Sequence, residues 1–341
     1  MPAPQLPESG WRLVVPDRGD AGVRLDLVLL RHLRSERGMS RTRIQKWIAA
    51  GDVLVNGTPA PRAAWRVAAG DELHVRWARP RARARPSPEP IPLDILYEDD
   101  HLLAVCKPAG LVVHPSYKNA SGTLINGVLQ RAESWPSGSK PSLLGRLDKQ
   151  TSGVVLVAKR PAIHATMQRA MDARRIDKDY LAVVWGKPSP PRGTIDLALD
   201  RDPWDRRRVT VTDRGGQPSV TLYQRLSVSP RRPGVPTCSL VRCRLITGRT
   251  HQIRVHLAAK GWPIIGDQVY GRRTPPSVAP DHDARGINRQ ALHAWRLSLP
   301  HPVTGRTLVI IAPLPSDMQA LCTALQLPTG PQTADTACVS T

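Results

Sequence analysis

The chain has 341 residues, and its 49 lysines and arginines outnumber its 28 aspartates and glutamates to give a formal net charge of +21. This length can bury a substantial core and suggests two domains. The charge exceeds what solubility requires and indicates a polyanionic partner, either nucleic acid or an anionic membrane surface. No apolar run reaches the roughly 18 residues of a spanning helix, and no secretory signal opens the chain, so we expect a soluble, cytoplasmic protein with no membrane partner.

The cysteines are odd in number, scattered, and lack the paired spacing of zinc sites. The sequence therefore predicts neither a disulfide framework nor a cysteine-based metal site. We expect no metal and no cofactor, and nothing in the chain indicates an obligate protein partner or more than a monomer.

Composition changes most sharply at residues 77–92, WARPRARARPSPEPIP. Alternating arginine and proline cannot build a core, so this stretch predicts an extended basic linker. Residues 20–76 then form a first domain and residues 93–325 a second. The ends, 1–19 and 326–341, are polar or proline-rich and are predicted to be flexible.

The first domain shows two helices and a hairpin. Leucines at 25, 29 and 33 share one helical face. Ser40 is a suitable N-cap for a second helix that ends at Gly51, and the Asn-Gly pair in VLVNG, residues 53–57, predicts a tight hairpin turn. The second helix carries three cations on its polar faces, either to bind a phosphate backbone or only to solvate the helix: Arg41, Arg43 and Lys46.

The order of these signals is more specific than the charge. RLD followed by SRTRIQKWIAAGDVLVNG resembles the small RNA-binding module of ribosomal small-subunit protein four, which also precedes the catalytic domain of several RNA-modifying enzymes. The resemblance implies that this domain binds RNA. We assign RNA contacts to the three helix cations and to the linker residues Arg81, Arg83 and Arg85.

The second domain mixes strand signals with a few helices. Strands are predicted at 102–108, 154–158, 180–186 and 237–248, and a helix begins at Pro161. The strands are too unevenly joined to helices for a repeating βαβ layout. The sequence therefore predicts an α+β domain with a mixed, mainly antiparallel sheet.

One carboxylate in this domain has the setting of a reactive acid. Asp148 lies in GRLDKQTSG, residues 145–153, between Arg146 and small residues suited to a tight turn at 151–153. The run VVLV follows at once and predicts a buried strand that starts just past Gly153. Reactive groups are often found on loops that a rigid scaffold positions. The alternative is an ordinary loop aspartate paired with Arg146.

Four further segments are organised around polar residues: CKPAGLVVHPS (106–116), RRIDKDYLAVVWG (174–186), TGRTHQIRVHLAAKGWPIIGDQVYG (247–271) and ALHAWRLSLPHPVTG (291–305). Together with GRLDKQTSG, and in this order, they resemble the RluA family of pseudouridine synthases, which isomerise uridine in RNA. The resemblance runs from the amino-terminal module to about residue 315. RLD alone is a weak signal, but five ordered motifs are specific.

The resemblance implies a role for each of four residues. Asp148 is the nucleophile or base, and Arg254 pairs with it, because a carboxylate enclosed in a pocket needs a nearby cation to stay charged. Tyr180 stacks beneath an extruded base, and Arg146 occupies the space that the base leaves. Three routes stay open: attack at ring carbon 6, attack at the anomeric carbon, or a glycal route.

Other polar residues receive weaker assignments. Lys107 contacts RNA phosphate or lines the pocket, unless it is only a solvated loop lysine. His251 and His256 lie five apart, not the four of a helical metal pair, so structural or RNA-contacting roles are expected. Residues 266–270 are read as a turn without chemistry. Gly145 stands where many relatives of the family carry histidine, so any contact of that histidine is missing.

These observations predict an RNA pseudouridine synthase. Large-subunit ribosomal RNA is the expected substrate, because an attached amino-terminal module accompanies ribosomal substrates most often in this family. The alternatives are the same activity on transfer RNA, or a non-catalytic RNA-binding or ribosome-assembly factor. A glycoside hydrolase would require two carboxylates across the scissile bond, and only Asp148 has a motif around it.

Overall fold

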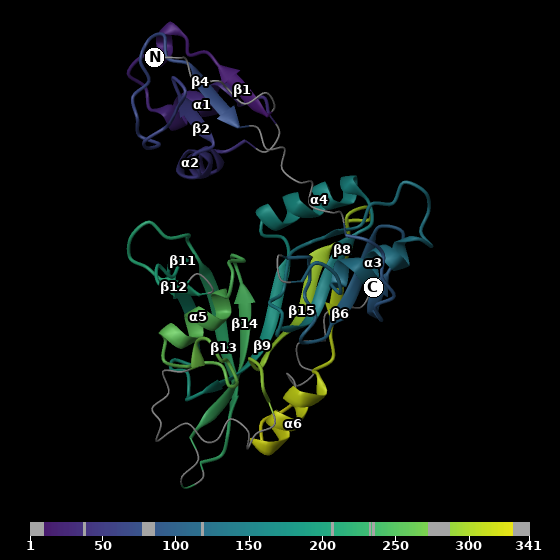
Figure 1. Ribbon diagram of the computed structural model, residues 1–341. Helices are drawn as coiled ribbons and strands as arrows, with labels where there is room; N and C mark the ends of the chain where they lie inside the picture. The colour runs from purple at the N-terminus through teal and green to yellow at the C-terminus, as the bar shows by residue number, and fades with distance from the viewer. Residues whose placement is uncertain are drawn as a thin grey trace. The chain divides into compact units, whose positions relative to one another are not determined.

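The computed structural model of the protein describes residues 10–36, 39–76, 86–116, 119–205, 208–231, 233, 236–271 and 287–329. The chain divides into two compact units, residues 1–85 and 86–341, each of which is described here by itself (Figure 1). Three of the predicted RNA contacts, Arg81, Arg83 and Arg85, lie outside the described residues. Within the described part of the chain, no helix combines the length and apolar character needed to cross a membrane.

The first unit packs two helices against a small antiparallel sheet. Among its described residues, four strands pair in the order β1-β4-β2-β3. The sheet comprises β1 (Trp11–Val14), β2 (Val53–Val55), β3 (Thr58–Pro59) and β4 (Leu73–Arg76), and the helical elements are η1 (Arg18–Asp20), α1 (Leu25–His32) and α2 (Arg41–Ala49). Leu25, Leu29 and Leu33 are fully buried in one core with Ile44 of α2 and Val75 of β4, so burial of this apolar face stabilises the unit.

Local sequence explains where these elements begin and end. The Ser40 hydroxyl accepts a hydrogen bond from the backbone N–H of Arg43 at 3.3 Å, which caps the start of α2. Gly51, at φ 77°, follows the end of that helix. Asn56 and Gly57 both have positive φ and join β2 to β3. Both predicted helices and the predicted hairpin are confirmed.

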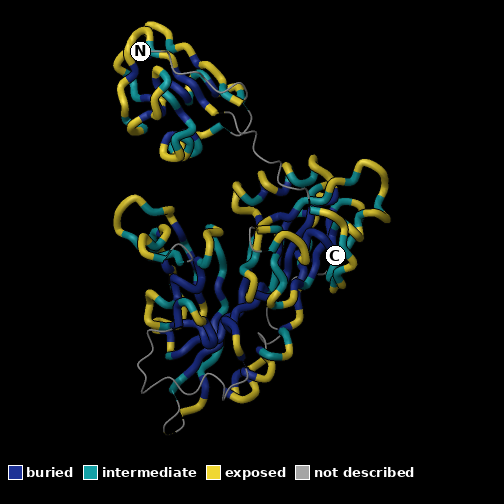
Figure 2. The backbone as a smooth tube through the Cα atoms, in the orientation of Figure 1, coloured by how far each residue is buried: buried dark blue, intermediate teal, exposed yellow. Residues whose placement is uncertain are grey.

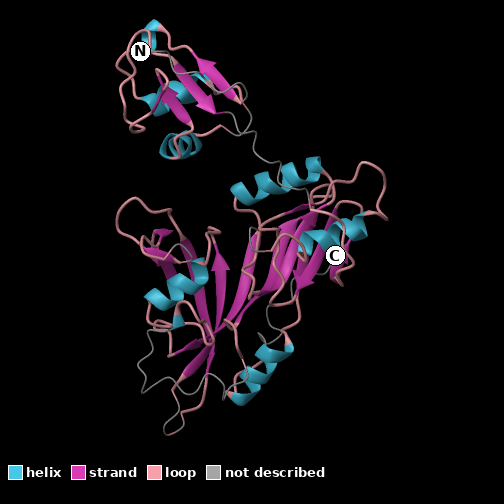
Figure 3. Cartoon of the chain, viewed as in Figure 1, coloured by secondary structure: helices cyan, strands magenta, loops and turns pink. Residues whose placement is uncertain are grey.

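The second unit is built on one large mixed sheet (Figure 3). Among its described residues the main order is β10-β13-β14-β9-β15-β8-β6-β5, with β16 beside β15 and β7 beside β8. The pairs are antiparallel except β15 with β8, so the predicted mixed, mainly antiparallel sheet is confirmed. The strands are β5 (Asp94–Glu98), β6 (Leu102–Lys107), β7 (Ser142–Leu143), β8 (Ser152–Ala158), β9 (Asp177–Trp185), β10 (Arg192–Asp196), β13 (Val220–Val228), β14 (Cys238–Leu245), β15 (Leu292–Pro300) and β16 (Thr307–Ile311).

Helices cover both faces of the sheet. Strand β8 is buried along its whole length (Figure 2), since Leu156 packs toward α4 (Pro161–Asp172) and Val157 toward α3 (Leu124–Ala132). Two more helices, α5 (Gln252–Ala259) and α6 (Ser316–Ala324), pack on the β9 and β14 half. A short ribbon of β11 (Leu199–Arg201) and β12 (Val209–Val211) contacts α5.

The parallel contact between β8 and β15 depends on a glycine. Gly153 has φ 117°, and a Cβ built on it would lie 2.2 Å from the backbone oxygen of Ala294. No side chain fits that space, so glycine is what lets the two backbones meet. The first two residues of β8 are thereby held against β15.

The structure corrects the predicted start of β8. Ser152 and Gly153 are already part of the strand. The tight turn spans residues 148–151, where the N–H of Thr151 donates to the backbone oxygen of Asp148 at 3.1 Å. The run of small residues was read as a turn because glycine favours turns, whereas here it permits close strand packing.

Candidate active site

Asp148 lies at the turn between β7 and β8. Two buried cations hold the backbone that follows it. Lys107, the last residue of β6, donates from Nζ to the carbonyl of Lys149 at 3.0 Å. Arg289 donates from Nη1 to the carbonyl of Gln150 at 3.1 Å, and its guanidinium also binds Asp317 of α6 through two nitrogens. The turn that carries Asp148 is therefore fixed from two directions.

The RNA contact predicted for Lys107 is wrong in this structure. Its side chain is fully buried, and Nζ also donates to the carbonyls of Pro108 and Leu111, at 2.7 and 2.9 Å. Burial, reinforced by repulsion from Arg289, lowers the pKa of Lys107 to about 7. An Nζ enclosed by three carbonyls is unavailable to a phosphate, so Lys107 supports the loop instead.

Arg254 of α5 joins two carboxylates. Its Nη1 donates to Oδ2 of Asp148 at 2.9 Å. Its Nε and Nη2 bind the two oxygens of Asp267, at 2.7 and 2.9 Å. Burial opposes the charge on Arg254, but the hydrogen bonds and charges of Asp267 and Asp148 outweigh it and raise the pKa of the guanidinium. Arg254 therefore remains a cation beside Asp148.

Asp267 is the rigid side of this arrangement. It is buried, and its Oδ1 also accepts from the backbone N–H groups of Val269 and Tyr270, at 2.9 and 3.0 Å. Burial would raise the pKa of Asp267, yet its bonds to Arg254 and to the backbone hold that pKa below its usual range. A bidentate pair fixes the plane of a guanidinium, so Asp267 determines where Nη1 points.

A cavity is lined by Asp148, Arg254, Tyr180 and Arg146 together. The structure thus brings the four predicted site residues to one place, although they come from different segments. Tyr180 lies in β9, between Cys243 of β14 and Ala294 of β15 in the register of the sheet. Burial, and then the nearby charge of Asp148, raises the pKa of Tyr180, which keeps the phenol neutral.

Gly145, which stands where many relatives carry histidine, has a backbone conformation that suits glycine. Gly145 has φ 105°, and a Cβ there would lie 3.7 Å from Nζ of Lys178. Arg146 and Lys178 line both the cavity around Asp148 and a neighbouring cavity. A side chain at position 145 would be strained at this φ and would contact Lys178.

The three cations predicted on α2 lie in the first unit. Arg41 and Lys46 are exposed, and Arg41 donates from Nε to Asp26 at 2.9 Å. The guanidinium carbon of Arg43 lies 5.1 Å from the centroid of the Trp47 ring. Arg41 retains further N–H groups for a phosphate, since Asp26 engages only one of them.

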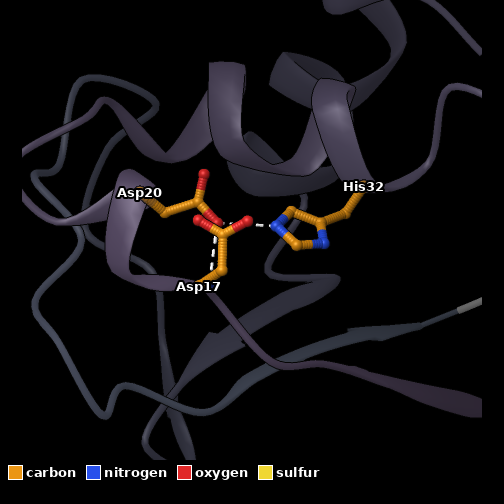
Figure 4. Close-up of side chains that lie close together, drawn as sticks. All are labelled: Asp17, Asp20 and His32. Carbon is orange, nitrogen blue, oxygen red and sulfur yellow. Dashed lines mark hydrogen bonds and ion pairs between the residues drawn. The ribbon is translucent and has the colours of Figure 1, made fainter.

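A possible metal cluster also lies in the first unit, at Asp17, Asp20 and His32 (Figure 4). Nε2 of His32 lies 2.6 Å from Oδ2 of Asp20. Arg31 binds both carboxylates, Asp20 through Nη1 at 3.0 Å and Asp17 through Nη2. Arg31 pairs with both acids and His32 contacts Asp20, so each carboxylate has a side-chain partner without a metal ion.

Sequence reasoning gave no role to three residues that shape this site. The sequence predicts only a turn for Asp267 and Tyr270, and it gives Arg289 no structural or catalytic role. The sequence offers one signal for Asp267, since it is the one acidic residue in the cationic segment 247–271. Its pairing with Arg254 spans 13 residues and depends on how the chain folds back after α5.

Comparison with known proteins places this geometry in a family. Residues 101–259 match the family described as RNA pseudouridylate synthase, and residues 23–73 match the S4 domain. The chain is 40% identical to a ribosomal large subunit pseudouridine synthase D from Nitrosomonas europaea, over 94% of this chain and 89% of that one. The chain belongs to the RNA pseudouridylate synthase family. A synthase of the same name from Xanthomonas campestris pv. campestris is 41% identical over 94% of each chain.

Solved structures of the family agree with the fold. Human RNA pseudouridylate synthase domain containing 4 is 25% identical, with a TM-score of 0.55 over 69% of this chain and 94% of its own. Family membership makes this chain an RNA pseudouridine synthase, an isomerase, with an amino-terminal S4 domain. The alternatives of a non-catalytic RNA-binding factor and a glycoside hydrolase are therefore wrong.

Proposed function

We propose that this synthase isomerises uridine in large-subunit ribosomal RNA and that Asp148 is the reacting carboxylate. This substrate is supported by the names of the relatives from Nitrosomonas europaea and Xanthomonas campestris pv. campestris, which are similar along almost the whole chain. The S4 domain and the charge of +21 suit a large polyanion. The observation that carries the chemistry is the 2.9 Å contact between Arg254 and Asp148 inside a cavity that Tyr180 also lines.

The reaction needs no outside reagent. The bond between ribose carbon 1′ and ring nitrogen 1 breaks, and a bond between carbon 1′ and ring carbon 5 forms. The proton on carbon 5 leaves and nitrogen 1 gains one, so atoms and electrons balance. A single carboxylate can act as nucleophile or as base in this sequence.

The two oxygens of Asp148 differ. Oδ2 accepts the hydrogen bond from Arg254, whereas Oδ1 has no hydrogen-bond partner among the described residues. The Asp148 side chain keeps 25% of its exposure and faces the cavity. We assign Oδ1 as the oxygen that reacts. Each of the three routes requires such an oxygen, whether it attacks carbon 6, attacks carbon 1′ or removes a ribose proton.

Tyr180 and Arg146 suit an extruded base. A neutral phenol ring offers a flat surface for stacking to any pyrimidine. Arg146 is exposed at the rim of the cavity, two residues before Asp148, where its guanidinium can enter the RNA as the base leaves. This proposal gives Tyr180 the role of a platform and Arg146 that of a substitute for the base.

Pseudouridine mapping tests both the residue and the substrate. Ribosomal and transfer RNA are mapped in cells with the intact protein, in cells without it, and in cells with Asp148→Asn. We expect the same sites in large-subunit ribosomal RNA to be lost in both altered strains, because an amide supplies no nucleophilic oxygen. Sites lost only in transfer RNA would refute the substrate, and an unchanged map with Asp148→Asn would refute the nucleophile.

A binding measurement separates chemistry from recognition. Purified Asp148→Asn should bind the RNA within a few-fold of the wild-type affinity, since the change removes no cation. Asp172→Asn is the matched control, because Asp172 is exposed on α4 and undergoes the same change. We expect that control to keep full activity.

A further inference from the structure

His251 is the N-cap residue of α5, three positions before Arg254. Its backbone has φ 56° and ψ 14°, the left-handed region that non-glycine residues seldom adopt. Such a conformation costs on the order of 1–3 kcal/mol and persists only where the surrounding structure enforces it. The strained backbone directs the imidazole toward the cavity that Asp148 lines.

The hydrogen bonds of Tyr270 favour one position for the proton of the neutral imidazole. The buried phenol oxygen accepts the backbone N–H of Val209 at 2.9 Å and lies 2.8 Å from Nδ1 of His251. Among the described residues, Nδ1 is the one acceptor within reach of the phenol proton. Donation from the phenol to Nδ1 gives its proton an acceptor, and this arrangement favours the neutral ring that carries its proton on Nε2.

That Nε2 faces the carboxylate of Asp148. It lies 3.8 Å from Oδ2, the same oxygen that accepts from Arg254. Burial lowers the pKa of His251 and outweighs the opposing charge of Asp148, so the neutral ring is favoured. The gap is too long for a hydrogen bond, but hydrogen bonds of catalytic groups often shorten only when substrate fills the site.

We propose that His251 is a positioning residue whose Nε2–H donates to Oδ2 of Asp148 when RNA fills the cavity. Arg254 and His251 then hold one oxygen from two directions, which turns Oδ1 toward the nucleotide. Tyr270 serves this arrangement by keeping the proton on Nε2. The inference rests on the proposed role of Asp148 and adds a second donor to it.

Two substitutions at His251 distinguish this role from a merely structural one. Glutamine places an N–H close to the position of Nε2, whereas asparagine reaches only as far as Nδ1. Asparagine, however, tolerates the left-handed backbone better than glutamine does. A structural role thus predicts that His251→Asn is the milder change, and a donor role predicts that His251→Gln is.

Single-turnover rates on RNA provide the first readout. We expect His251→Asn to slow the reaction about tenfold to a hundredfold, because a displaced nucleophile loses rate at that scale. His251→Gln should be clearly faster than His251→Asn, and both should bind RNA as tightly as the wild type. Equal rates for the two variants, or a faster His251→Asn, would overturn the proposal.

Nitrogen-15 NMR of the imidazole is a second readout. It is made on the intact protein, so it does not depend on the activity of a His251 variant. In the intact protein the His251 signal should show a protonated Nε2 and an unprotonated Nδ1. Tyr270→Phe keeps the ring that Arg254 contacts at 5.0 Å but removes the phenol proton, so a mixture of tautomers should follow. A proton found on Nδ1 of the wild type would refute the inference.

Parallel controls separate this inference from the proposed function. His164→Asn, on α4 away from the residues that line the cavity, should retain the wild-type rate. Asp148→Asn is measured in the same assay. If Asp148→Asn is active, the proposed nucleophile is wrong; if it is inactive while His251→Asn is fully active, the role of His251 alone is wrong.

Discussion

At the scale of single residues, the site depends on how Arg254 distributes its hydrogen bonds between Asp267 and Asp148. Asp267 is fully buried and uses both oxygens on Arg254, whereas the Asp148 side chain keeps 25% of its exposure and offers one. The buried acid fixes the guanidinium and the exposed acid is left able to react. A lysine at position 254 would lack the planar fork that allows this division.

We expect Asp267→Asn to harm both stability and rate. The amide would turn an N–H group toward the guanidinium and leave Asp148 as the one carboxylate that Arg254 contacts among the described residues. Removing one partner of a buried ion pair costs about 3 kcal/mol in the free energy of unfolding. The rate should fall at least tenfold, because Nη1 would no longer be held on Asp148.

Thermal unfolding and single-turnover assays measure these two effects. Asp172→Asn again serves as the matched control, since it neutralises an exposed acid on α4. If Asp267→Asn folds and reacts at the wild-type rate, then Asp267 does not position Arg254.

At the scale of elements, the site is placed by the parallel contact of β8 with β15. His293 pairs with Ser152 and Ala294 with Gly153. This short contact joins the segment that bears Asp148 to the half of the sheet that bears Tyr180. The backbone of Gly153 therefore helps to position the site, although Gly153 does not line the cavity.

Gly153→Ala should disrupt this contact. Its Cβ would meet the backbone of Ala294 at 2.2 Å in a strained φ, and we expect a loss of about 3 kcal/mol or more in the free energy of unfolding. Gly138→Ala is the matched control, because Gly138 has φ 86° with nothing within 4 Å of its Cβ. That change should cost only about 1 kcal/mol. Equal melting temperatures for the two variants would contradict the importance of the contact.

The elements that the sequence predicts are those whose signal is local. The run at 154–157 and the helix that begins at Pro161 can be read from apolar spacing within one segment. Strand β15 could not be read this way. It pairs with β8, β9 and β16, and Arg296 within it binds buried Asp179 at 3.2 Å, so its polar residues hide the strand.

The site divides in the same manner. Asp148, Arg254 and Tyr180 were found because motifs carry them, and the structure brings them together. The contact of Tyr270 with Val209 spans 61 residues, and no local pattern encodes it. Lys107 was misread because its position before a proline suggests a loop, while the fold buries it at the end of β6.

At the scale of the whole molecule, RNA affinity and catalysis can be assigned to different parts of the chain. The net charge of +21 exceeds what one cavity can use, and we propose that most of it serves affinity for the RNA backbone. The proposed catalytic residues all lie in the second unit. We therefore propose that residues 20–76 and the linker at 77–92 supply affinity and that residues 93–325 supply the chemistry.

Two deletions test this division and separate the first domain from the basic linker. Removing residues 1–76 should weaken RNA binding and flatten its dependence on salt, because each lost phosphate contact lowers the logarithmic slope by about 0.7–0.9. Removing residues 1–85 also deletes the arginines at 79, 81, 83 and 85 and should flatten the slope further.

Both proteins should still isomerise RNA at saturating concentration, since every residue that lines the cavity is retained. A truncated protein that folds but is inactive at saturation would show that the first domain takes part in catalysis, and an unchanged salt slope would show that it contributes no phosphate contacts.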